Sequence, residues 1–195
     1  HGVIFPPPLS IEQSSSEITA KFKANLVSGN TMVDLTGGTG IDTFYFNEAF
    51  HKIDYVERSH LLCEVAGHNF GLFSKNINIF NVEAAHYLSA MQERADLIYL
   101  DPARRNDRNN KVFLLQDCEP DVVALQYEML SRADRVLIKT SPMLDINLAE
   151  SALEHVKTVY IVAVGNEVKE VLYLLERDYS GKIEINTVNL NKTNG

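Results

Sequence analysis

Two aspartates close short apolar runs in this chain, where their side chains can accept hydrogen bonds. Asp34 follows "TMV" and leads into the turn "LTGGTG", and Asp101 follows "ADLIYL" and leads into "PARR". In α/β sheets, ligands bind in the crevice outside the carboxyl ends of the strands. We therefore expect Asp34 and Asp101 to project into one cleft, where Asp34 accepts a hydrogen bond from a cationic or hydroxyl group.

The turn after Asp34 carries Gly37, Gly38 and Gly40, which permit positive φ and a close approach of the backbone to a ligand. A phosphate-binding P-loop would end in Gly-Lys-Ser/Thr, which this turn lacks. Gly38 and Gly40 meet the start of the dinucleotide fingerprint G-x-G-x-x-G/A, but Thr43 stands at its third position. The remaining class is an adenosine ligand without a pyrophosphate, namely S-adenosylmethionine.

Two glutamates follow the next apolar runs, where such a ligand needs hydrogen-bond acceptors. Glu57 comes about 20 residues after the turn, and its carboxylate can accept from both ribose hydroxyls. Glu83 follows the third run and can accept from the adenine amino group. The alternatives are a helix-capping role for Glu57 and a solvated surface position for Glu83.

The chain resembles the class I S-adenosylmethionine-dependent methyltransferases in the order of its chemical residues, which are Asp34, Gly38, Gly40, Glu57, Glu83, Asp101 and Pro102. Thr36 stands where that family usually has a glycine, a departure that RNA methyltransferases of the cap guanine-N2 type often share. Nearly the whole chain is similar to a little-characterised bacterial family related to RNA guanine-N2 methyltransferases, which carries THUMP-like and ferredoxin-like flanking domains. The blocks that carry this resemblance are "PPPLSIEQSSSEITAKFKA", "DLTGGTGIDTF", "VERSHLLCEVAGHNF", "LDPARR" and "IKTSPMLDI".

The resemblance implies a role for each matching residue. The residues implied to bind the cofactor are Asp34, Thr36, Gly37, Gly38, Gly40, Asp42, Glu57, Arg58, Val82, Glu83 and Ala84. Asp101 and Pro102 are implied to place the acceptor amine, and substrate contacts are implied for Arg104, Arg105, Lys139 and Ser141. The serines at 14–16 and Thr19 match a block that lies over the methionine end in related RNA enzymes, although plain helix capping accounts for them equally well.

The loop that begins at Asp101 and Pro102, which we call the acceptor loop, departs from the Asp/Asn-Pro-Pro-aromatic block of amino-methylating enzymes. Ala103 and Arg104 replace the last two residues of that block. Arg104 can stack on a base or grip a phosphate, and Arg105, Arg108 and Lys111 add positive charge for a polynucleotide. The alternative is a solvated loop whose arginines pair with acids such as Asp107. For Lys139, a phosphate contact and a pair with Asp145 are equally open.

The elements that position these residues alternate between strands and helices. Apolar runs predict strands at 31–35, 52–57, 76–81, 95–101, 135–139, 158–164 and 182–190. Amphipathic patterns predict helices at 15–27, 41–50, 58–73, 84–94, 120–133 and 146–155. Residues 166–178 suit a helix by composition and a strand by pattern, and we favour a strand. The fold predicted is α/β, with a mainly parallel seven-stranded sheet and helices on both faces, which the resemblance makes a Rossmann-like methyltransferase fold.

Composition limits the remaining possibilities. The net charge of −8 argues against a broad basic surface for nucleic acid but leaves room for a local patch. Cys63 and Cys118 form no CxxC pair and the six histidines show no ligand spacing, so we predict no metal and a reduced, cytoplasmic protein without a membrane anchor. The start at His1 suggests a fragment, in which residues 1–30 pack on the cofactor side of a methyltransferase domain at 31–195.

The sequence as a whole predicts a methyltransferase that uses S-adenosylmethionine to methylate a nucleobase amino group, most specifically guanine N2 in RNA. One alternative is a cofactor-binding module that is inactive without its flanking domains. Another is a nucleotide-dependent oxidoreductase, and a small-molecule or protein methyltransferase is a weaker third.

Overall fold

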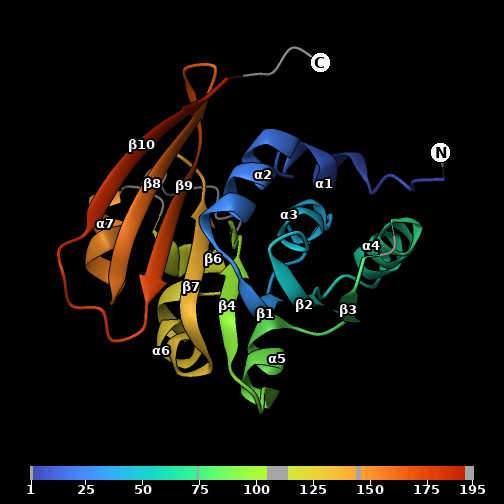
Figure 1. Ribbon diagram of the computed structural model, residues 1–195, viewed down its shortest axis with the longest axis horizontal. Coiled ribbons are helices and arrows are strands. Elements are labelled where there is room, and N and C mark those ends of the chain that lie inside the picture. Colours follow the sequence, from blue (N-terminus) through green and yellow to red (C-terminus); the bar gives the residue numbers. More distant parts are fainter. Residues whose placement is uncertain (1, 74, 105–113, 144–145, 192–195) are drawn as a thin grey trace. The chain divides into compact units, whose positions relative to one another are not determined.

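The computed structural model describes residues 2–73, 75–104, 114–143 and 146–191 (Figure 1). The chain forms two compact units, His1–Ile98 and Tyr99–Gly195, which we describe in turn. The main sheet has eight strands, and a separate pair of short strands forms a second sheet. In the described ranges, no helix has both the length and the apolar character that a membrane crossing requires.

The first unit alternates helices and strands around the glycine turn. Its helices are α1 (Pro8–Glu12), α2 (Glu17–Leu26), α3 (Ile41–Phe46), α4 (His60–Leu72) and α5 (Ala84–Ala90). Its strands are β1 (Gly29–Asp34), β2 (Phe50–Val56), β3 (Ile77–Phe80) and β4 (Ala95–Leu100), the last of which ends in the second unit. They lie in the order β4-β1-β2-β3. The parallel pairing sets Asp34 opposite Tyr55 and Val56 opposite Phe80, so the carboxyl ends of β1, β2 and β3 lie side by side.

Alternate residues of β2 point to opposite faces of the sheet, as the pleat of a strand requires. Tyr55 packs against Cys63, Ala66 and Phe70 of α4 in a buried cluster. Its neighbour Asp54 accepts a hydrogen bond of 2.6 Å from the hydroxyl of Tyr87 on α5. Helices α4 and α5 therefore cover opposite faces of this part of the sheet (Figure 1).

The second unit begins with the acceptor loop and ends in an antiparallel insertion. Its short elements are β5 (Ala103–Arg104), the 3₁₀ turn Leu115–Asp117 and β6 (Cys118–Glu119), and β5 pairs with β6. Its longer elements are α6 (Val122–Arg132), β7 (Ala133–Thr140), α7 (Ile146–Ala152), β8 (Val156–Val164), β9 (Glu167–Glu176) and β10 (Glu184–Leu190). The strands lie in the order β10-β8-β9-β7, with β9 antiparallel to both of its neighbours and β10 parallel to β8.

The predicted α/β class is confirmed, but the sheet has eight strands and the number seven was wrong. The additional strand is β9, so the strand favoured at 166–178 is confirmed, although the composition of that segment also suited a helix. Six consecutive residues of β9 are buried, because the strand lies between β7 and β8 and is covered on both faces. This environment outweighs the helix propensity of its leucines and glutamates.

Other elements also differ from the sequence-based expectations. The short helix α1 was not predicted, and it begins at Pro8, where a residue without an N–H costs no hydrogen bond. The helix expected at 41–50 ends at Phe46, and Phe50 already belongs to β2. Helix α2 agrees with the prediction, and its N-cap Ser16 accepts from the Thr19 amide at 3.4 Å.

Candidate functional site

The glycine turn between β1 and α3 is tight because aromatic rings of the first unit press against it. Gly38 and Gly40 have φ values of 55° and 79°, which side-chain residues rarely adopt. A Cβ at Gly37 would lie 2.1 Å from the Tyr55 ring, and one at Gly40 would lie 2.7 Å from Phe70. Glycine is therefore required at all three positions, for steric reasons at two of them and for backbone conformation at Gly38 and Gly40.

Asp34 braces this turn from within the protein. One carboxylate oxygen accepts from the Thr36 amide at 3.0 Å, and the other accepts from the Thr43 hydroxyl at 2.6 Å. The residue is only 1% exposed. The structure thus gives Asp34 a role in shaping the turn, while direct contact with the cofactor stays a prediction.

Glu57 connects the end of β2 to the same turn. Its carboxylate accepts from the Gly38 amide at 3.0 Å and from the Ser59 amide at 2.7 Å. Ser59 is the N-cap of α4 and uses its own hydroxyl for the Leu62 amide, so Glu57 is not the capping side chain of that helix. A carboxylate has about four acceptor positions, so the two amides leave capacity for the predicted ribose contact.

Tyr55 and Asn81 belong to this site although sequence reasoning did not select them. The Tyr55 hydroxyl donates to the Gly38 carbonyl at 2.6 Å, and burial raises the pKa of this phenol, which keeps it a protonated donor. The Asn81 side chain donates to the carbonyls of Glu57 and Arg58 at 2.9 and 3.0 Å. By residue type, Tyr55 suits the core and Asn81 suits a polar loop. Only the pairing of the strands brings both residues to the turn.

The residues predicted around the adenine lie at the start of α5. Glu83 is exposed at the N-cap of this helix and makes no side-chain capping bond. Val82 is half-buried, Ala84 is buried and Arg58 is exposed. Glu83 is thus accessible, and both its adenine contact and its alternative as a solvated acid stay open.

Asp42, predicted to bind cofactor, is engaged by a lysine that the sequence did not indicate. Lys23 of α2 is 0% exposed, and its ammonium lies 3.2 Å from Asp42 and 3.0 Å from the Ser15 hydroxyl. Ser15 in turn donates to Asp42 at 2.8 Å. This cluster of Ser15, Lys23 and Asp42 fixes α2 against the first turn of α3, so Asp42 has a structural partner whatever it contacts besides.

The predicted acceptor residues lie in the second unit. Asp101 is 32% exposed at the end of β4 and forms an ion pair with Lys139 of β7, whose side chain is 13% exposed. The ends of these two strands bring Lys139 to Asp101, a partner that the sequence did not indicate. Asp145 lies outside the described residues, and the phosphate contact stays a prediction. Pro102 is buried, and the Ser141 hydroxyl accepts from the Met143 amide at 3.3 Å. Arg105, Asp107, Arg108 and Lys111 lie outside the described residues, as does the side chain of Arg104.

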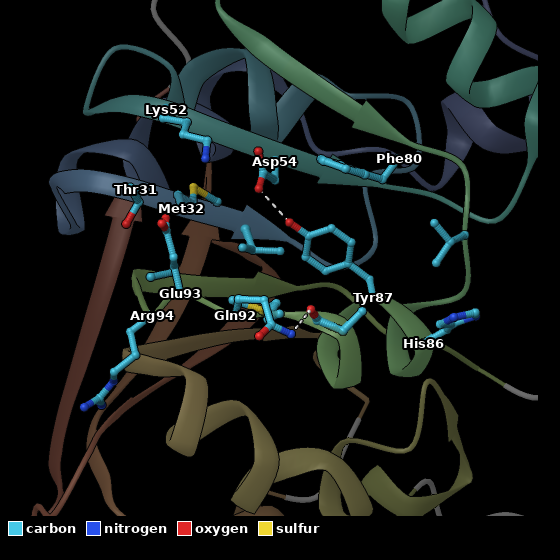
Figure 2. A pocket seen from close by; sticks show the side chains of 15 residues that line it. Thr31, Met32, Lys52, Asp54, Phe80, His86, Tyr87, Gln92, Glu93 and Arg94 are labelled. Atoms are coloured by element: carbon cyan, nitrogen blue, oxygen red, sulfur yellow. Dashed lines mark hydrogen bonds between the residues drawn. The ribbon is translucent and has the colours of Figure 1, made fainter.

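A cavity of about 510 Å³ lies on the α5 face of the first unit, away from the glycine turn. Figure 2 shows Lys52 and Asp54 of β2 and Tyr87 of α5 among its walls, with Tyr87 hydrogen-bonded to Asp54. Of the predicted cofactor residues only Val82 lines it. Asp34, Gly38 and Glu57 do not line it, so the cofactor site predicted from the sequence lies at the turn and not in this cavity.

Several solved structures are similar to this chain in fold. A candidate methyltransferase from Porphyromonas gingivalis W83 is 33% identical with a TM-score of 0.87, over 96% of this chain and 48% of that one. This chain has the Rossmann-like methyltransferase fold. It spans about half the length of that relative.

More distant structures share the methyltransferase fold. An rRNA methylase from Streptococcus thermophilus is 13% identical with a TM-score of 0.57, over 89% of this chain and 98% of that one. A candidate methyltransferase from Streptococcus mutans, in complex with SAH, is 12% identical with a TM-score of 0.56, over 89% of this chain and 99% of that one. No protein-family model matches the chain. No curated protein matches its sequence.

Proposed function

We propose that this chain is the catalytic part of an S-adenosylmethionine-dependent methyltransferase that modifies an exocyclic amino group of a nucleobase in RNA, with guanine N2 as the specific target. The fold and the 33%-identical relative support the methyltransferase class. The likeness to an rRNA methylase, together with the guanine-N2 resemblance of the motifs, supports the RNA substrate.

The hydrogen bonding of the glycine turn supports this cofactor most directly. In phosphate-binding turns, backbone N–H groups point at the anion. Here the amides of Gly37, Gly38 and Gly40 are bonded to the Val56 carbonyl, the Glu57 carboxylate and the Gly37 carbonyl, at 2.9, 3.0 and 2.9 Å. A pyrophosphate would meet the Glu57 carboxylate in place of open amides. An adenosyl ligand with a ribose diol and a positive sulfonium suits a carboxylate at this point.

The chain's own residues would divide the work between binding and placement. The glycine turn and Glu57 would hold the adenosyl part, and Glu83 and Val82 would border the adenine. When bound, S-adenosylmethionine supplies a methyl group already activated by its sulfonium. Asp101 and the Pro102 backbone would hold the acceptor amine so that the nitrogen lone pair points at that methyl group. Such alignment is worth about 7–11 kcal/mol, so no strong base is required.

The test is a methylation assay on RNA from a strain that lacks the gene. The full-length protein and this chain alone are each incubated with that RNA and isotope-labelled S-adenosylmethionine, and the nucleosides are analysed by mass spectrometry. We expect labelled N2-methylguanosine with the full-length protein. Activity only in the full-length protein would identify this chain as a cofactor-binding module that needs its flanking domains.

Binding of S-adenosylhomocysteine and of NAD, measured by calorimetry, tests the cofactor separately. Binding of NAD alone would replace the proposal with an oxidoreductase. Labelled lysine or a labelled small molecule in place of labelled RNA would keep the methyltransferase class and reject the substrate. We also expect the full-length protein to be cytoplasmic, which fractionation of the native cells would test.

A further inference from the structure

We infer that Lys139 is a specificity-determining residue that compensates the charge of the Asp101 carboxylate and so selects an uncharged amine over a protonated alkyl amine. This inference rests on the proposed methyltransferase function. It assigns to Lys139 a role at the acceptor amine, in place of the phosphate contact that the sequence motif had suggested.

The contact between Lys139 and Asp101 carries the inference. The Lys139 ammonium donates to one oxygen of the Asp101 carboxylate, and both residues belong to the second unit. Lys139 is largely buried, with 13% of its side chain exposed, whereas Asp101 keeps 32%. The acid that faces solvent is thus backed by a cation that is mostly covered by protein.

Strand pairing holds Lys139 in this position. Its backbone lies opposite Leu172 of β9, and the next residue, Thr140, lies opposite Val171. Thr140 is buried, and its hydroxyl donates to the Val171 carbonyl at 3.3 Å. This pairing fixes the backbone position of Lys139. From there its side chain reaches Asp101, and the ammonium orients the carboxylate.

The charge balance of this pair decides which amine the site accepts. An isolated carboxylate attracts a protonated alkyl amine such as a lysine side chain, and that amine has no lone pair for attack until it loses its proton. A carboxylate already paired with an ammonium attracts such a cation less strongly, because the ammonium compensates its charge. It can still accept a hydrogen bond from the N–H of a neutral exocyclic amine. The nucleobase amino group is neutral at physiological pH and keeps its nitrogen lone pair, so it is the class that this pair suits.

The experiment compares the full-length wild-type protein with Lys139→Met and Lys139→Arg on three readouts. These are methyl transfer to RNA, calorimetric binding of methylammonium to the SAH-saturated protein, and affinity for SAH itself. For Lys139→Met we expect turnover on RNA to fall roughly 100-fold, as misplacement of a reacting group can do, with SAH affinity within about twofold of wild type. Lys139→Arg keeps the charge and should retain turnover within about tenfold.

Methylammonium binding separates the two roles, because a purely structural role of Lys139 would leave this binding unchanged. Wild type should bind none, and Lys139→Met should gain binding that the double variant Lys139→Met, Asp101→Asn loses again. Lys157→Met is the matched control, since Lys157 forms a 2.7 Å pair with Glu176 in the same unit and should change none of the three readouts. If Lys139→Met does not fold, Lys139→Gln takes its place.

Loss of turnover together with Asp101-dependent methylammonium binding supports the inference. The same gain of binding in a protein that methylates no RNA would reject the proposed function and leave the charge compensation standing. Wild-type turnover in Lys139→Met, without any gain of methylammonium binding, would overturn the inference.

Discussion

The Tyr55 hydroxyl donates a hydrogen bond of 2.6 Å to the carbonyl of Gly38, while the Tyr55 ring fills the space where a side chain at Gly37 would stand. Tyr55→Phe keeps the ring and removes the donor, so the turn should loosen without collapsing. We expect a loss of about 1 kcal/mol in the free energy of unfolding and weaker SAH binding, measured by chemical denaturation and calorimetry. Tyr87→Phe, which removes a 2.6 Å bond to Asp54, is the control and should lose stability without losing SAH affinity. Equal SAH affinity in the two variants would show that the Gly38 carbonyl does not shape the site.

Gly37 should not tolerate even a methyl group. Gly37→Ala would place its Cβ 2.1 Å from the Tyr55 ring, and we expect about 1–3 kcal/mol of destabilisation from this overlap, together with loss of SAH binding. Gly71→Ala is the matched control because no atom lies within 4 Å of its added Cβ. In helix α4 that change should leave stability equal or higher by about 0.5–1 kcal/mol. Thermal unfolding and calorimetry on both variants check the pair, and a Gly37→Ala protein as stable as wild type would contradict the tight packing of Tyr55 against this turn.

Glu57 should govern cofactor affinity more than stability. Glu57→Ala removes an acceptor from the Gly38 and Ser59 amides and from the predicted ribose contact. We expect SAH binding to weaken by about 1.5–3 kcal/mol, the range for a hydrogen bond to a charged group. Glu83→Ala, at an exposed N-cap without a capping bond, provides a comparison within the same unit. An unchanged SAH dissociation constant in Glu57→Ala would move the ribose site elsewhere.

Asp101 should separate binding from chemistry. Asp101→Ala is expected to keep SAH affinity near that of wild type and to abolish methyl transfer, because the residue is assigned to the acceptor amine and not to the cofactor. Asp121→Ala, which removes the N-cap of α6, should lose about 1 kcal/mol of stability and no turnover. Single-turnover assays with calorimetry in parallel measure both effects. Parallel loss of SAH binding and turnover in Asp101→Ala would refute its acceptor role.

Lys23 should contribute to stability because it compensates the charge of Asp42. Lys23→Met removes the cation from the Asp42 carboxylate, which is only 11% exposed and keeps its hydrogen bond from Ser15, and breaking a buried pair in this way costs about 3–5 kcal/mol. Lys21→Met, two residues earlier, removes a solvent-exposed pair with Glu17 and a contact with the Tyr45 ring at 5.5 Å, and should change little. Denaturant melts of the two variants compare them directly. A Lys23→Met protein as stable as Lys21→Met would show that the buried pair contributes nothing.

Much of the fold was predictable because its strands are short apolar runs with turns between them. β1 to β4, β7 and β8 all follow from that pattern, and the glycine turn follows from residue type. The strand favoured at 166–178 is confirmed as β9, although composition left a helix open, because a segment rich in leucine and glutamate becomes a strand only when neighbours cover both faces. The extent of α3 was also overestimated, since a local pattern does not mark where Phe50 joins a sheet.

The candidate site was predictable in its acids and not in their partners. Asp34, Glu57 and Asp101 stand at strand ends, which a pattern of apolar runs locates. Thr43 bonds to Asp34 from a helix and Lys139 bonds to Asp101 from another strand, while Tyr55 donates to the Gly38 carbonyl of the turn, and strand register decides which side chains meet. Each of these partners also has an ordinary interpretation as core or surface, so residue type alone does not select it.

The bond between Thr43 and Asp34 also limits how this protein can change its ligand. Thr43 occupies the position of the last glycine in the dinucleotide signature, so a single Thr43→Gly exchange would complete that sequence motif. Both residues are buried, and the exchange would take away the donor that Thr43 supplies to Asp34 at 2.6 Å, at a cost of about 1–3 kcal/mol. A descendant that recruited a nicotinamide coenzyme would have to alter the threonine and the aspartate together, so the two classes of enzyme are separated here by a paired mutational step.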